Sequence, residues 1–333
     1  MKNQKARRLR YAIIGTGAIG GYYGARLQQS GCDVHFLLRS DYEHVRENGL
    51  VVESIDGDFM LPEVNVYSHS ANMPPVDVAI VALKTTQNFR LPELLPSINP
   101  GGAVLLFQNG IGVEAETVQI LGALAPTVSA PTVLGGLCFI CVNKVEPGHI
   151  KHLEYGRVLI GAHDGQGQPC APTPLIEEII ADLTRAKIEA EAVEDLPMAR
   201  WKKLVWNVPY NGLSVVLNAT TDEMMADEGV RSLITTLMQE VITVANAWAE
   251  HISPNLDRSI SDSWADIMLA QTESMQPYRT SMKIDYDKKR PLEIDAILGN
   301  PLRIAQKLDL AAPSMTMLYH QLCFLNAANA GLQ

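Results

Sequence analysis

The stretch that decides the fold is RYAIIGTGAIGG, at residues 10–21. Its apolar beginning, residues 10–14, predicts a buried strand, and the glycine pattern GxGxxG follows directly at residues 15–20. A helical pattern opens after the glycines, and a second β-rich run follows at residues 33–38. Strand, glycine turn, helix and strand in this order predict a βαβ unit with a parallel sheet.

The three glycines of the pattern have separate physical roles. Gly15 makes the tight turn, Gly17 lets the backbone approach a pyrophosphate, and Gly20 allows the helix to pack closely on the strand. The N-terminus of the helix supplies amide donors and the positive end of its dipole. The pattern therefore predicts a Rossmann dinucleotide-binding domain, with a glycine-rich turn that binds no ligand as the alternative. Its predicted cofactor-binding residues are Gly15, Thr16, Gly17, Ala18, Ile19 and Gly20.

The end of the second strand indicates which dinucleotide is bound. An NAD site usually has Asp or Glu about 20 residues after the glycines, where the carboxylate binds the ribose hydroxyls. This chain has Leu38-Arg39-Ser40 at that place. A guanidinium pairs well with a phosphate. We therefore predict NADPH as the cofactor, with Arg39 at its 2′-phosphate; a surface arginine without this role is the alternative.

Strand and helix patterns alternate up to Leu196-Pro197, and only helical patterns follow. The predicted further strands lie at 76–83, 103–107, 126–133 and 157–161, and the predicted later helices at 197–218, 222–251, 256–275, 292–308 and 313–329. This order predicts an α/β fold with an N-terminal Rossmann domain, residues 1–196, and an all-helical C-terminal domain, residues 197–333.

Length and charge agree with this organisation and exclude some functions. The 333 residues exceed the usual size of one domain. A net charge of −10 argues against a nucleic-acid partner. The basic cluster at residues 2–10 is expected to be a solvated terminus, with an electrostatic arm as the alternative. No apolar run reaches the roughly 18 residues of a membrane span or resembles a signal peptide, so a cytoplasmic location is expected.

The cysteines and two neighbouring histidines require consideration as redox or metal sites. Cys138 and Cys141 form a CxxC, but apolar residues flank the pair and no second pair follows. We interpret both as buried free thiols. His149 and His152 have a ligand-like spacing without an accompanying carboxylate or thiol cluster. We expect these to be loop histidines, and no metal site is predicted.

A polar stripe marks the first helix of the C-terminal domain. At about 100° per residue, five polar side chains of residues 201–218 fall on one narrow arc: Lys203, Asn207, Asn211, Ser214 and Asn218. The rest of the helix is mostly apolar, which indicates burial, and buried polar groups need partners or a ligand. The stripe predicts a binding site, with a structural network of asparagines as the alternative. Lys202 lies outside the arc, and Pro209 is expected to kink the helix.

Two further polar features lie downstream. A helix is predicted to open at Pro291, with Glu293 in its first turn, where the helix dipole favours a carboxylate. Asp295 points nearly the opposite way. Residues 279–282 form a short polar segment in an otherwise helical region.

Taken together, these motifs resemble the ketopantoate reductase (2-dehydropantoate 2-reductase) family over essentially the whole chain. The matching motifs are GTGAIG at 15–20, LKTTQ at 83–87, QNG at 108–110, WKKLVWN at 201–207 with Asn211, TSM at 280–282 and LEID at 292–295. The resemblance implies a helical domain like that of 6-phosphogluconate dehydrogenase, a site between the domains, and reduction of 2-dehydropantoate to pantoate with NADPH for pantothenate biosynthesis. The same resemblance implies a homodimer through the helical domain.

The resemblance also implies roles for single residues. Lys203 matches the general acid, and Glu293 matches a glutamate near the ribose and the substrate hydroxyl. Cofactor contacts are implied for Arg39, Lys84, Asn109 and Glu293, and substrate contacts for Asn109, Asn207, Asn211 and Ser281.

Two departures leave the substrate open. Thr221 stands where the family often has a substrate-contacting asparagine, and the segment 134–152 looks longer than in compact members. Both are expected where the substrate would sit. The alternatives are therefore a reductase of another branched 2-oxo acid and a catalytically silent NADPH sensor. Retention of Lys203, Asn207, Asn211 and Glu293 together argues against the sensor.

Overall fold

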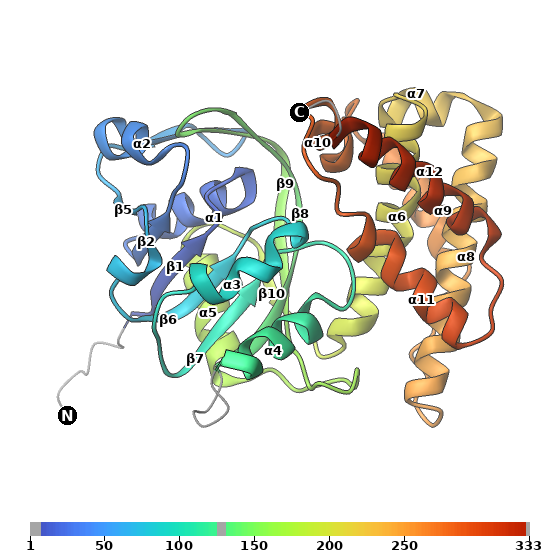
Figure 1. The fold of residues 1–333 in the computed structure, drawn as a ribbon, viewed down its shortest axis with the longest axis horizontal. Helices are drawn as coiled ribbons and strands as arrows, with labels where there is room; N and C mark the ends of the chain where they lie inside the picture. Colours follow the sequence, from blue (N-terminus) through green and yellow to red (C-terminus); the bar gives the residue numbers. More distant parts are fainter. Residues whose placement is uncertain (1–7, 125–130, 331–333) are drawn as a thin grey trace. The chain divides into compact units, whose positions relative to one another are not determined.

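The computed structural model describes residues 8–124 and 131–330 (Figure 1). The chain forms two compact units. The first unit consists of residues 1–108, 113–165 and 169–196, and the second of residues 109–112, 166–168 and 197–333. Two short segments thus belong to the second unit although the chain around them belongs to the first.

In the described part of the first unit, ten strands form one sheet. The strands are β1 (Arg10–Ile14), β2 (Asp33–Leu37), β3 (Leu50–Ser54), β4 (Phe59–Leu61), β5 (Asn65–Tyr67), β6 (Val76–Val81), β7 (Ile98–Leu106), β8 (Thr132–Glu146), β9 (His149–Ala162) and β10 (Ala190–Ala192). Their order is β4-β3-β9-β8-β7-β6-β1-β2-β5, and β10 pairs with β9. From β8 to β5 all neighbours are parallel.

Helices and 3₁₀ turns connect these strands. They are α1 (Ala18–Gln29), α2 (Tyr42–Asn48), η1 (Ser70–Asn72), η2 (Thr85–Arg90), α3 (Leu91–Leu94), α4 (Val113–Leu124) and α5 (Pro174–Arg185). Helix α1 contacts α5, and α3 contacts α4 (Figure 1). Strand β6 is buried along its whole length, as expected for a parallel strand in the middle of a sheet. From β1 the chain first adds β2 on one side of the sheet and later adds β6 on the other side. Ligands of such sheets bind at the carboxyl ends of the strands where the strand order switches sides.

The region after β7 differs from the prediction. Of the strand predicted at 126–133, residues 132 and 133 form the start of β8, which continues to Glu146; residues 126–130 lie outside the described residues. The segment 134–152 belongs to a long antiparallel hairpin of β8 and β9. Its turn contains Gly148, whose φ is +67°. The apolar run of β8 lacks a period of two, so the sequence pattern did not reveal this hairpin.

The expected loop environment of the histidines is therefore wrong, and the expected burial of the two cysteines holds for Cys141 but not for Cys138, which is half-buried. His149 and His152 lie in β9 rather than in a loop, and both hydrogen-bond or pair with β3 residues. Cys138 and Cys141 lie in β8 as free thiols. Within residues 8–124 and 131–330, no group of three or more His, Cys, Asp or Glu is arranged to hold a metal ion.

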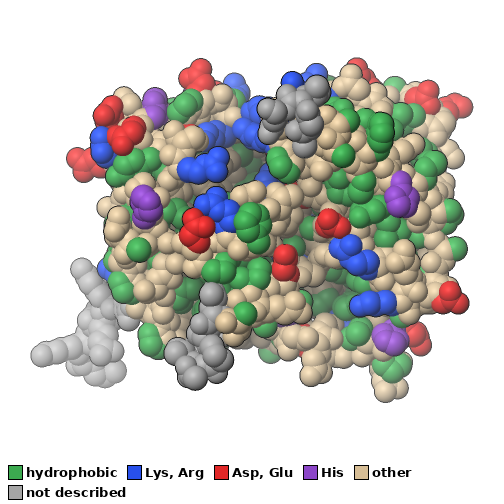
Figure 2. Space-filling view, in the orientation of Figure 1, with side chains coloured by type: hydrophobic (Ala, Val, Ile, Leu, Met, Phe, Trp, Pro, Cys, Tyr) green, Lys and Arg blue, Asp and Glu red, His purple; other side chains and the backbone are tan. Residues whose placement is uncertain are grey.

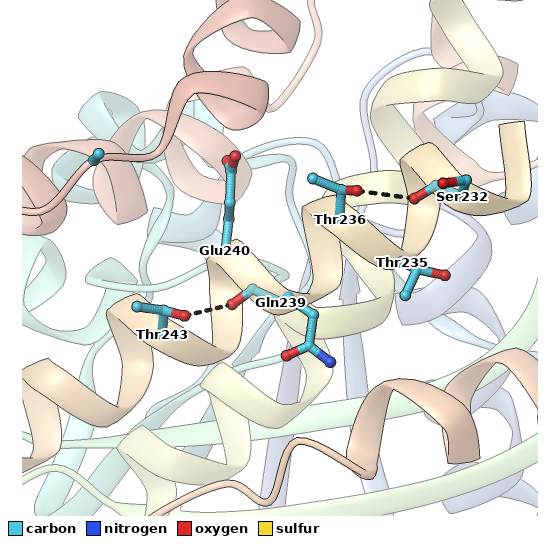
Figure 3. Close-up of a pocket in the computed structure, with 7 residues that line it drawn as sticks. Ser232, Thr235, Thr236, Gln239, Glu240 and Thr243 are labelled. Atoms are coloured by element: carbon cyan, nitrogen blue, oxygen red, sulfur yellow. Dashed lines mark hydrogen bonds between the residues drawn. The ribbon is translucent and has the colours of Figure 1, made fainter. Parts of the chain in front are cut away.

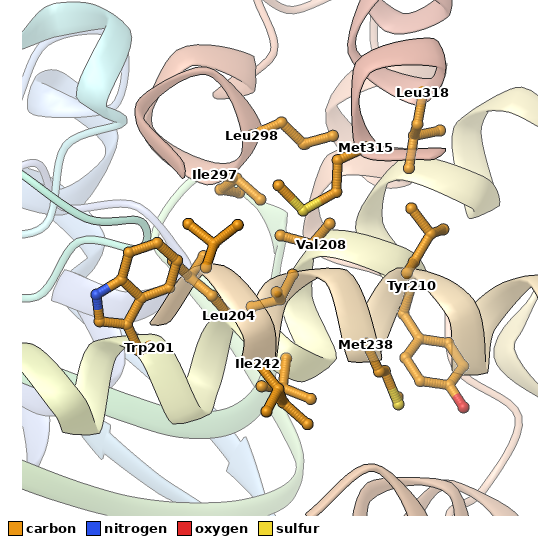
Figure 4. Packing of buried hydrophobic residues seen from close by; sticks show 14 of the residues in the cluster. Trp201, Leu204, Val208, Tyr210, Met238, Ile242, Ile297, Leu298, Met315 and Leu318 are labelled. Carbon is orange, nitrogen blue, oxygen red and sulfur yellow. The ribbon is translucent and has the colours of Figure 1, made fainter. Parts of the chain in front are cut away.

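The second unit is a helical bundle around α6. Its helices are α6 (Leu196–Val216), α7 (Thr221–Ala226), α8 (Glu228–Ile252), α9 (Trp264–Ser274), α10 (Ser281–Asp287), the π-turn η3 (Asp295–Gly299), α11 (Asn300–Lys307) and α12 (Pro313–Ala330). Figure 4 shows Leu204 and Val208 of α6 among side chains from α8, η3 and α12. The buried apolar surface of α6 is the reason for its central place. In the part of the chain that the structure describes, no helix has both the length and the apolarity to cross a membrane.

Three helix predictions need correction. The helix expected at 222–251 is two helices, because Asp227 ends α7 and its side chain accepts the Val230 amide at 2.9 Å to cap α8. The helix expected at 256–275 begins only at Trp264. The helix predicted at 197–218 runs through Pro209 but ends at Val216. Asn218 is exposed with φ of +55°, so it leaves the polar stripe.

The predicted class, an α/β Rossmann domain followed by a helical domain, is confirmed.

Candidate functional site

The glycine turn lies between the ends of β1 and β6. Gly15 has φ of +96°, and a Cβ there would lie 2.8 Å from the Leu83 amide nitrogen that follows β6. A Cβ at Gly20 would lie 2.3 Å from the Gly15 carbonyl oxygen. A Cβ at Gly17 would meet no atom within 4 Å. The turn is therefore packed tightly against the sheet at Gly15 and Gly20, and open at Gly17, where a ligand backbone can approach.

The first turn of α1 suits a phosphate. Gly17 caps the helix without a side-chain hydrogen bond, and no acidic residue lies in the first turn. The first amides of a helix have no acceptor inside it and bear the positive end of the dipole. The Thr16 hydroxyl is used to hold the turn, since it donates to the Leu37 carbonyl at 3.0 Å. Figure 2 shows Lys and Arg side chains gathered around a hollow in the region of α1. The residues present fit the pyrophosphate of a dinucleotide.

Arg39 follows β2 at the same edge of the sheet. Its side chain is exposed and makes no hydrogen bond or ion pair with the described residues. The nearby carboxylate of Asp41 is buried, paired with Lys144 and bound by the Gly148 amide at 3.3 Å. Burial raises the pKa of Asp41, but the hydrogen bonds from Lys144 and Ser40 outweigh it and lower that pKa overall. The free charge near the end of β2 is thus positive.

A buried amide pair supports the backbone before Lys84. The Gln108 side-chain nitrogen donates to the Leu83 carbonyl at 2.9 Å and to the Asn88 amide oxygen at 2.7 Å. Asn88 is fully buried and in turn donates to Glu116 at 2.9 Å. Sequence reasoning missed Gln108 and Asn88 as supporting residues, although both lie in or beside motifs that it selected. Their contacts fix the strand end that faces Gly15.

Lys203 and Asn109 form a pair within the second unit. The Lys203 Nζ donates to the Asn109 Oδ1 at 3.0 Å. Lys203 is half-buried, whereas Lys202 is exposed and its amine lies 5.6 Å from the centre of the Trp264 ring. An amine placed beside an amide oxygen is a group that can act as a proton donor. Two residues far apart in sequence thus meet at one polar point.

The rest of the polar stripe divides into two kinds of residue. Asn207 is 5% exposed, and its Nδ2 has no hydrogen-bond partner in the described structure. The Asn211 Oδ1 accepts the Met282 amide at 3.3 Å and the Ser281 hydroxyl at 3.4 Å. Ser214 is fully buried and shares a hydrogen bond of 2.8 Å with Thr280. Ser214 and the oxygen of Asn211 thus hold residues 280–282 rather than other asparagines of the stripe, and Asn207 keeps an open donor.

Glu293 lies directly before the helix that it was expected to enter. Helical backbone begins one residue later, and the Glu293 carbonyl accepts the Ile297 amide at 3.2 Å. Its side chain is buried, with 6% exposure, whereas Asp295 is exposed and pairs with Arg303. The opposite directions expected for the two carboxylates agree with this difference.

Thr221 has a structural role in this chain. Its amide donates to the Tyr278 carbonyl, and its hydroxyl accepts the Tyr278 amide, both at 3.1 Å. The side chain is 1% exposed. The two bonds tie the start of α7 to the segment before α10, so this departure from the family pattern places a residue that is engaged within the fold.

A hydroxyl-lined pocket on α8 lies apart from these residues (Figure 3). The hydroxyls of Thr236 and Thr243 donate to backbone carbonyls of α8. The Glu240 carboxylate accepts the amides of Ser314 and Met315 at 2.9 and 2.8 Å, and so caps α12. These polar groups are already used to hold helices, and none of the predicted site residues lines the pocket.

Known proteins resemble this chain along almost its whole length. The family model described as ketopantoate reductase PanE/ApbA matches residues 11–165, and that of its C-terminal part matches residues 195–326. A 2-dehydropantoate 2-reductase of Nostoc sp. is 53% identical over 321 residues, which are 96% of each chain. The crystal structure of 2-dehydropantoate 2-reductase from Geobacter metallireducens is 41% identical, with a TM-score of 0.85 over 94% of this chain and 99% of that one. The chain therefore belongs to the ketopantoate reductase family.

Proposed function

We propose that the protein reduces 2-dehydropantoate to pantoate with NADPH. The observation that carries the proposal is the half-buried Lys203 ammonium, held by the Asn109 amide oxygen on a helix with further inward polar groups. The whole-length identity of 53% with the Nostoc 2-dehydropantoate 2-reductase supports the choice of substrate. A reductase of this kind needs a hydride donor, an acid for the carbonyl oxygen and groups that hold a carboxylate.

Lys203 is the proposed acid. The chemistry that the bound dinucleotide supplies is hydride for C2 of the 2-oxo acid. Negative charge then grows on the carbonyl oxygen, and Lys203 stabilises this charge and donates a proton to it. General-acid help of this kind is typically worth about 10²–10⁴ in rate. The Asn109 Oδ1, 3.0 Å from the Lys203 Nζ, orients the amine. Correct orientation of a catalytic group increases the reaction rate.

The amide nitrogens of α6 are the proposed substrate donors. The Asn207 Nδ2 lacks a partner, and the Asn211 side chain uses only its oxygen in the hydrogen bonds described. The two residues are four positions apart and share one face of α6. Two such donors, with the Ser281 hydroxyl, match the carboxylate and the terminal hydroxyl of 2-dehydropantoate. Glu293 is proposed to accept a hydrogen bond from a substrate or ribose hydroxyl.

The cofactor site is proposed at the carboxyl ends of β1, β2 and β6. The residues from Gly15 to Gly20 would hold the pyrophosphate, Arg39 the 2′-phosphate, and Lys84 the part of the dinucleotide near the end of β6. The free guanidinium of Arg39 and the neutralised Asp41 support NADPH over NADH.

We further propose that residues 1–196 bind the cofactor and residues 197–333 bind the substrate and form a homodimer. Segment 109–112 packs with the second unit, so Asn109 would act with the substrate-binding part. Light scattering coupled to size-exclusion chromatography tests the dimer. The cytoplasmic location expected from the sequence stays a prediction.

The test is a panel of 2-oxo acids followed by the loss of NADPH absorbance. The matched control for 2-dehydropantoate is 3,3-dimethyl-2-oxobutanoate, which lacks only the terminal hydroxyl. A site that binds this hydroxyl should prefer 2-dehydropantoate by at least about 10²-fold in kcat/KM. Equal or better use of the control or of 2-oxoisovalerate would favour the reductase of another branched acid. Tight NADPH binding without oxidation by any acid would favour the sensor.

A further inference from the structure

The loop of residues 109–112 is built into the core of the helical unit. Ile111 is 7% exposed and packs in the cluster that includes Leu204 and Ile297. Its amide donates to the Ala296 carbonyl at 3.0 Å. The loop that carries Asn109 is therefore fixed to the residues around η3.

The π-turn η3 makes this attachment possible. In an α-helix the Asn300 amide would donate to the carbonyl four residues back, which belongs to Ala296. In η3 it donates instead to the Asp295 carbonyl, five residues back. The Ala296 carbonyl is thereby released and accepts the Ile111 amide. Single π-turns within helices are often found at functional sites, and this one has an identifiable use.

The Asn300 side chain completes the attachment. Its Nδ2 donates to the Ile111 carbonyl at 2.6 Å, so residues around the turn hold both the amide and the carbonyl of Ile111. Its Oδ1 accepts from Arg303 at 2.6 Å, so the nitrogen rather than the oxygen of the amide faces Ile111. On the other side of the loop, Arg200 donates to the Gly110 carbonyl at 3.2 Å.

Gly110 allows the close approach that these bonds need. Its φ is +95°, and a Cβ there would lie 2.5 Å from the Ala296 carbonyl oxygen. The loop backbone therefore lies directly against the π-turn, with no room for a side chain between them. Asn109, the preceding residue, is held with its oxygen at the Lys203 amine.

We propose that Asn300 is a positioning residue, which acts through the Ile111 peptide and Asn109 to hold the Lys203 amine in its working direction. The role in catalysis rests on the proposed function, whereas the attachment of the loop does not. In this proposal Asn300 does not contact the reacting atoms or the cofactor. It acts by fixing the position of Asn109.

The variant that tests this is Asn300→Asp. It keeps the size of the side chain and the contact with Arg303, and it replaces the donor to the Ile111 carbonyl by an oxygen that repels it. Arg303→Ala is the matched control, because it removes the neighbour of Asn300 and leaves the donor to Ile111. Asn300→Ser, which is uncharged and too short to reach Ile111, serves as a second variant if Asn300→Asp folds poorly.

Hydrogen exchange of the ligand-free protein is the first readout. In Asn300→Asp, the peptide that covers residues 108–113 should exchange at least about 10-fold faster, whereas peptides of α6 keep their rates. Arg303→Ala should leave this peptide within about 2-fold of the unchanged protein. Unchanged exchange in both Asn300 variants would overturn the proposal, whatever the protein reduces.

A double-mutant cycle with Asn109→Ala is the second readout. Asn300→Asp alone should lower kcat about 10-fold, with a smaller change in KM for the 2-oxo acid. In the Asn109→Ala background the same substitution should cost less than about 2-fold, because residues that act as a unit are not additive. A full additional loss in that background would overturn the proposal. Failure of the unmodified protein to reduce any 2-oxo acid would instead overturn the proposed function, and the exchange result would still decide the attachment.

Discussion

The glycine turn of the first unit and the polar stripe of the second unit are built in different ways. The glycine turn is backbone: at Gly15 and Gly20 even a Cβ would collide with main-chain oxygen or nitrogen. The stripe consists of side chains on one buried helix, and their partners come from Asn109 and from the start of α10. A backbone site can be recognised from a few consecutive residues, whereas a side-chain site depends on which distant segments meet it.

The glycine turn and the polar stripe also differ in how many roles their residues have. Each glycine of the turn acts through the absence of a side chain, although each does so for a different neighbour. The stripe mixes purposes: Ser214 and the oxygen of Asn211 hold α10, whereas Lys203 and the nitrogen of Asn207 are the groups that we propose to act on the substrate. Substitutions in the turn should therefore act through shape, and substitutions in the stripe through single functional groups.

The largest expected effect is that of Lys203→Ala. Loss of the acid should lower kcat/KM about 10²–10⁴-fold, because the polar stripe holds no second ammonium that could donate a proton to the alkoxide. Lys202→Ala is the control, since this neighbouring lysine is exposed and lies over Trp264; it should stay within about 2-fold. Steady-state NADPH oxidation measures both, with circular dichroism as the check of folding. Similar losses of kcat/KM in the two variants would contradict the assignment of Lys203, rather than Lys202, as the acid.

Gly17→Ala should come next, and it separates binding from folding in the glycine turn. The new methyl group meets no protein atom within 4 Å, so the thermal midpoint should hold, but it blocks the approach of the pyrophosphate. The dissociation constant for NADPH should rise about 10²-fold, as measured by calorimetry. Gly20→Ala should destabilise the fold itself, because its Cβ would lie 2.3 Å from the Gly15 carbonyl oxygen.

A control for the two glycine variants lies on α4. A Cβ at Gly122 would also meet no atom within 4 Å, and Gly122→Ala should stabilise the helix by about 0.5–1 kcal/mol without changing cofactor affinity. Equal affinity of the Gly17→Ala and Gly122→Ala proteins for NADPH would contradict the role given to the turn.

Arg39→Ala should have a smaller and more selective effect. A charge-assisted contact to a phosphate contributes about 1.5–3 kcal/mol, or roughly 10–100-fold. The ratio of kcat/KM for NADPH to that for NADH should fall by this factor, with kcat itself little changed. Arg46→Ala, on α2, is the control, because Arg46 pairs with Glu43. An unchanged cofactor ratio in Arg39→Ala would remove the argument for NADPH.

The smallest expected effect is a pH dependence confined to the first unit. His152 is buried, with its ring 4.5 Å from Tyr22 of α1, and burial lowers its pKa from the ordinary value. Its Nε2 donates to the Tyr155 carbonyl at 2.8 Å, so Nδ1 accepts from the Ser54 hydroxyl. Protonation would put a second donor in place of that acceptor.

The sign follows from the lowered pKa. The unfolded chain takes up the proton first, near the ordinary histidine pKa of about 6.5; the stability that the neutral ring contributes is therefore complete above that pH and is lost as the pH falls through it. When the pH is lowered from 8 to 5, the urea concentration at half-unfolding should fall more for the protein without substitutions than for the His152→Gln variant. Hydrogen exchange should increase in α1 before α6. A steeper fall in the variant would contradict this assignment.

Much of the fold and part of the site could be predicted from local patterns. The apolar run at β1, the glycines after it and the change to helical periodicity after Leu196 depend on residues close in sequence. The stripe was predicted because helical geometry alone places Lys203, Asn207 and Asn211 on one face. The β8–β9 hairpin was not predicted, because its apolar run has no clear period and its pairing is antiparallel over a long distance.

The sequence by itself thus determined the glycine turn, the alternation of strands and helices, and the face of α6 that carries Lys203. Only the tertiary structure decided that Asn109 packs with the helical unit, that a π-turn releases the Ala296 carbonyl for Ile111, and that the oxygen of Asn211 is already used. The physical reason is the range of the interactions. Periodicity and glycine sterics act between neighbours along the chain, whereas a hydrogen bond between residues ninety or more positions apart exists only after the fold has brought them together.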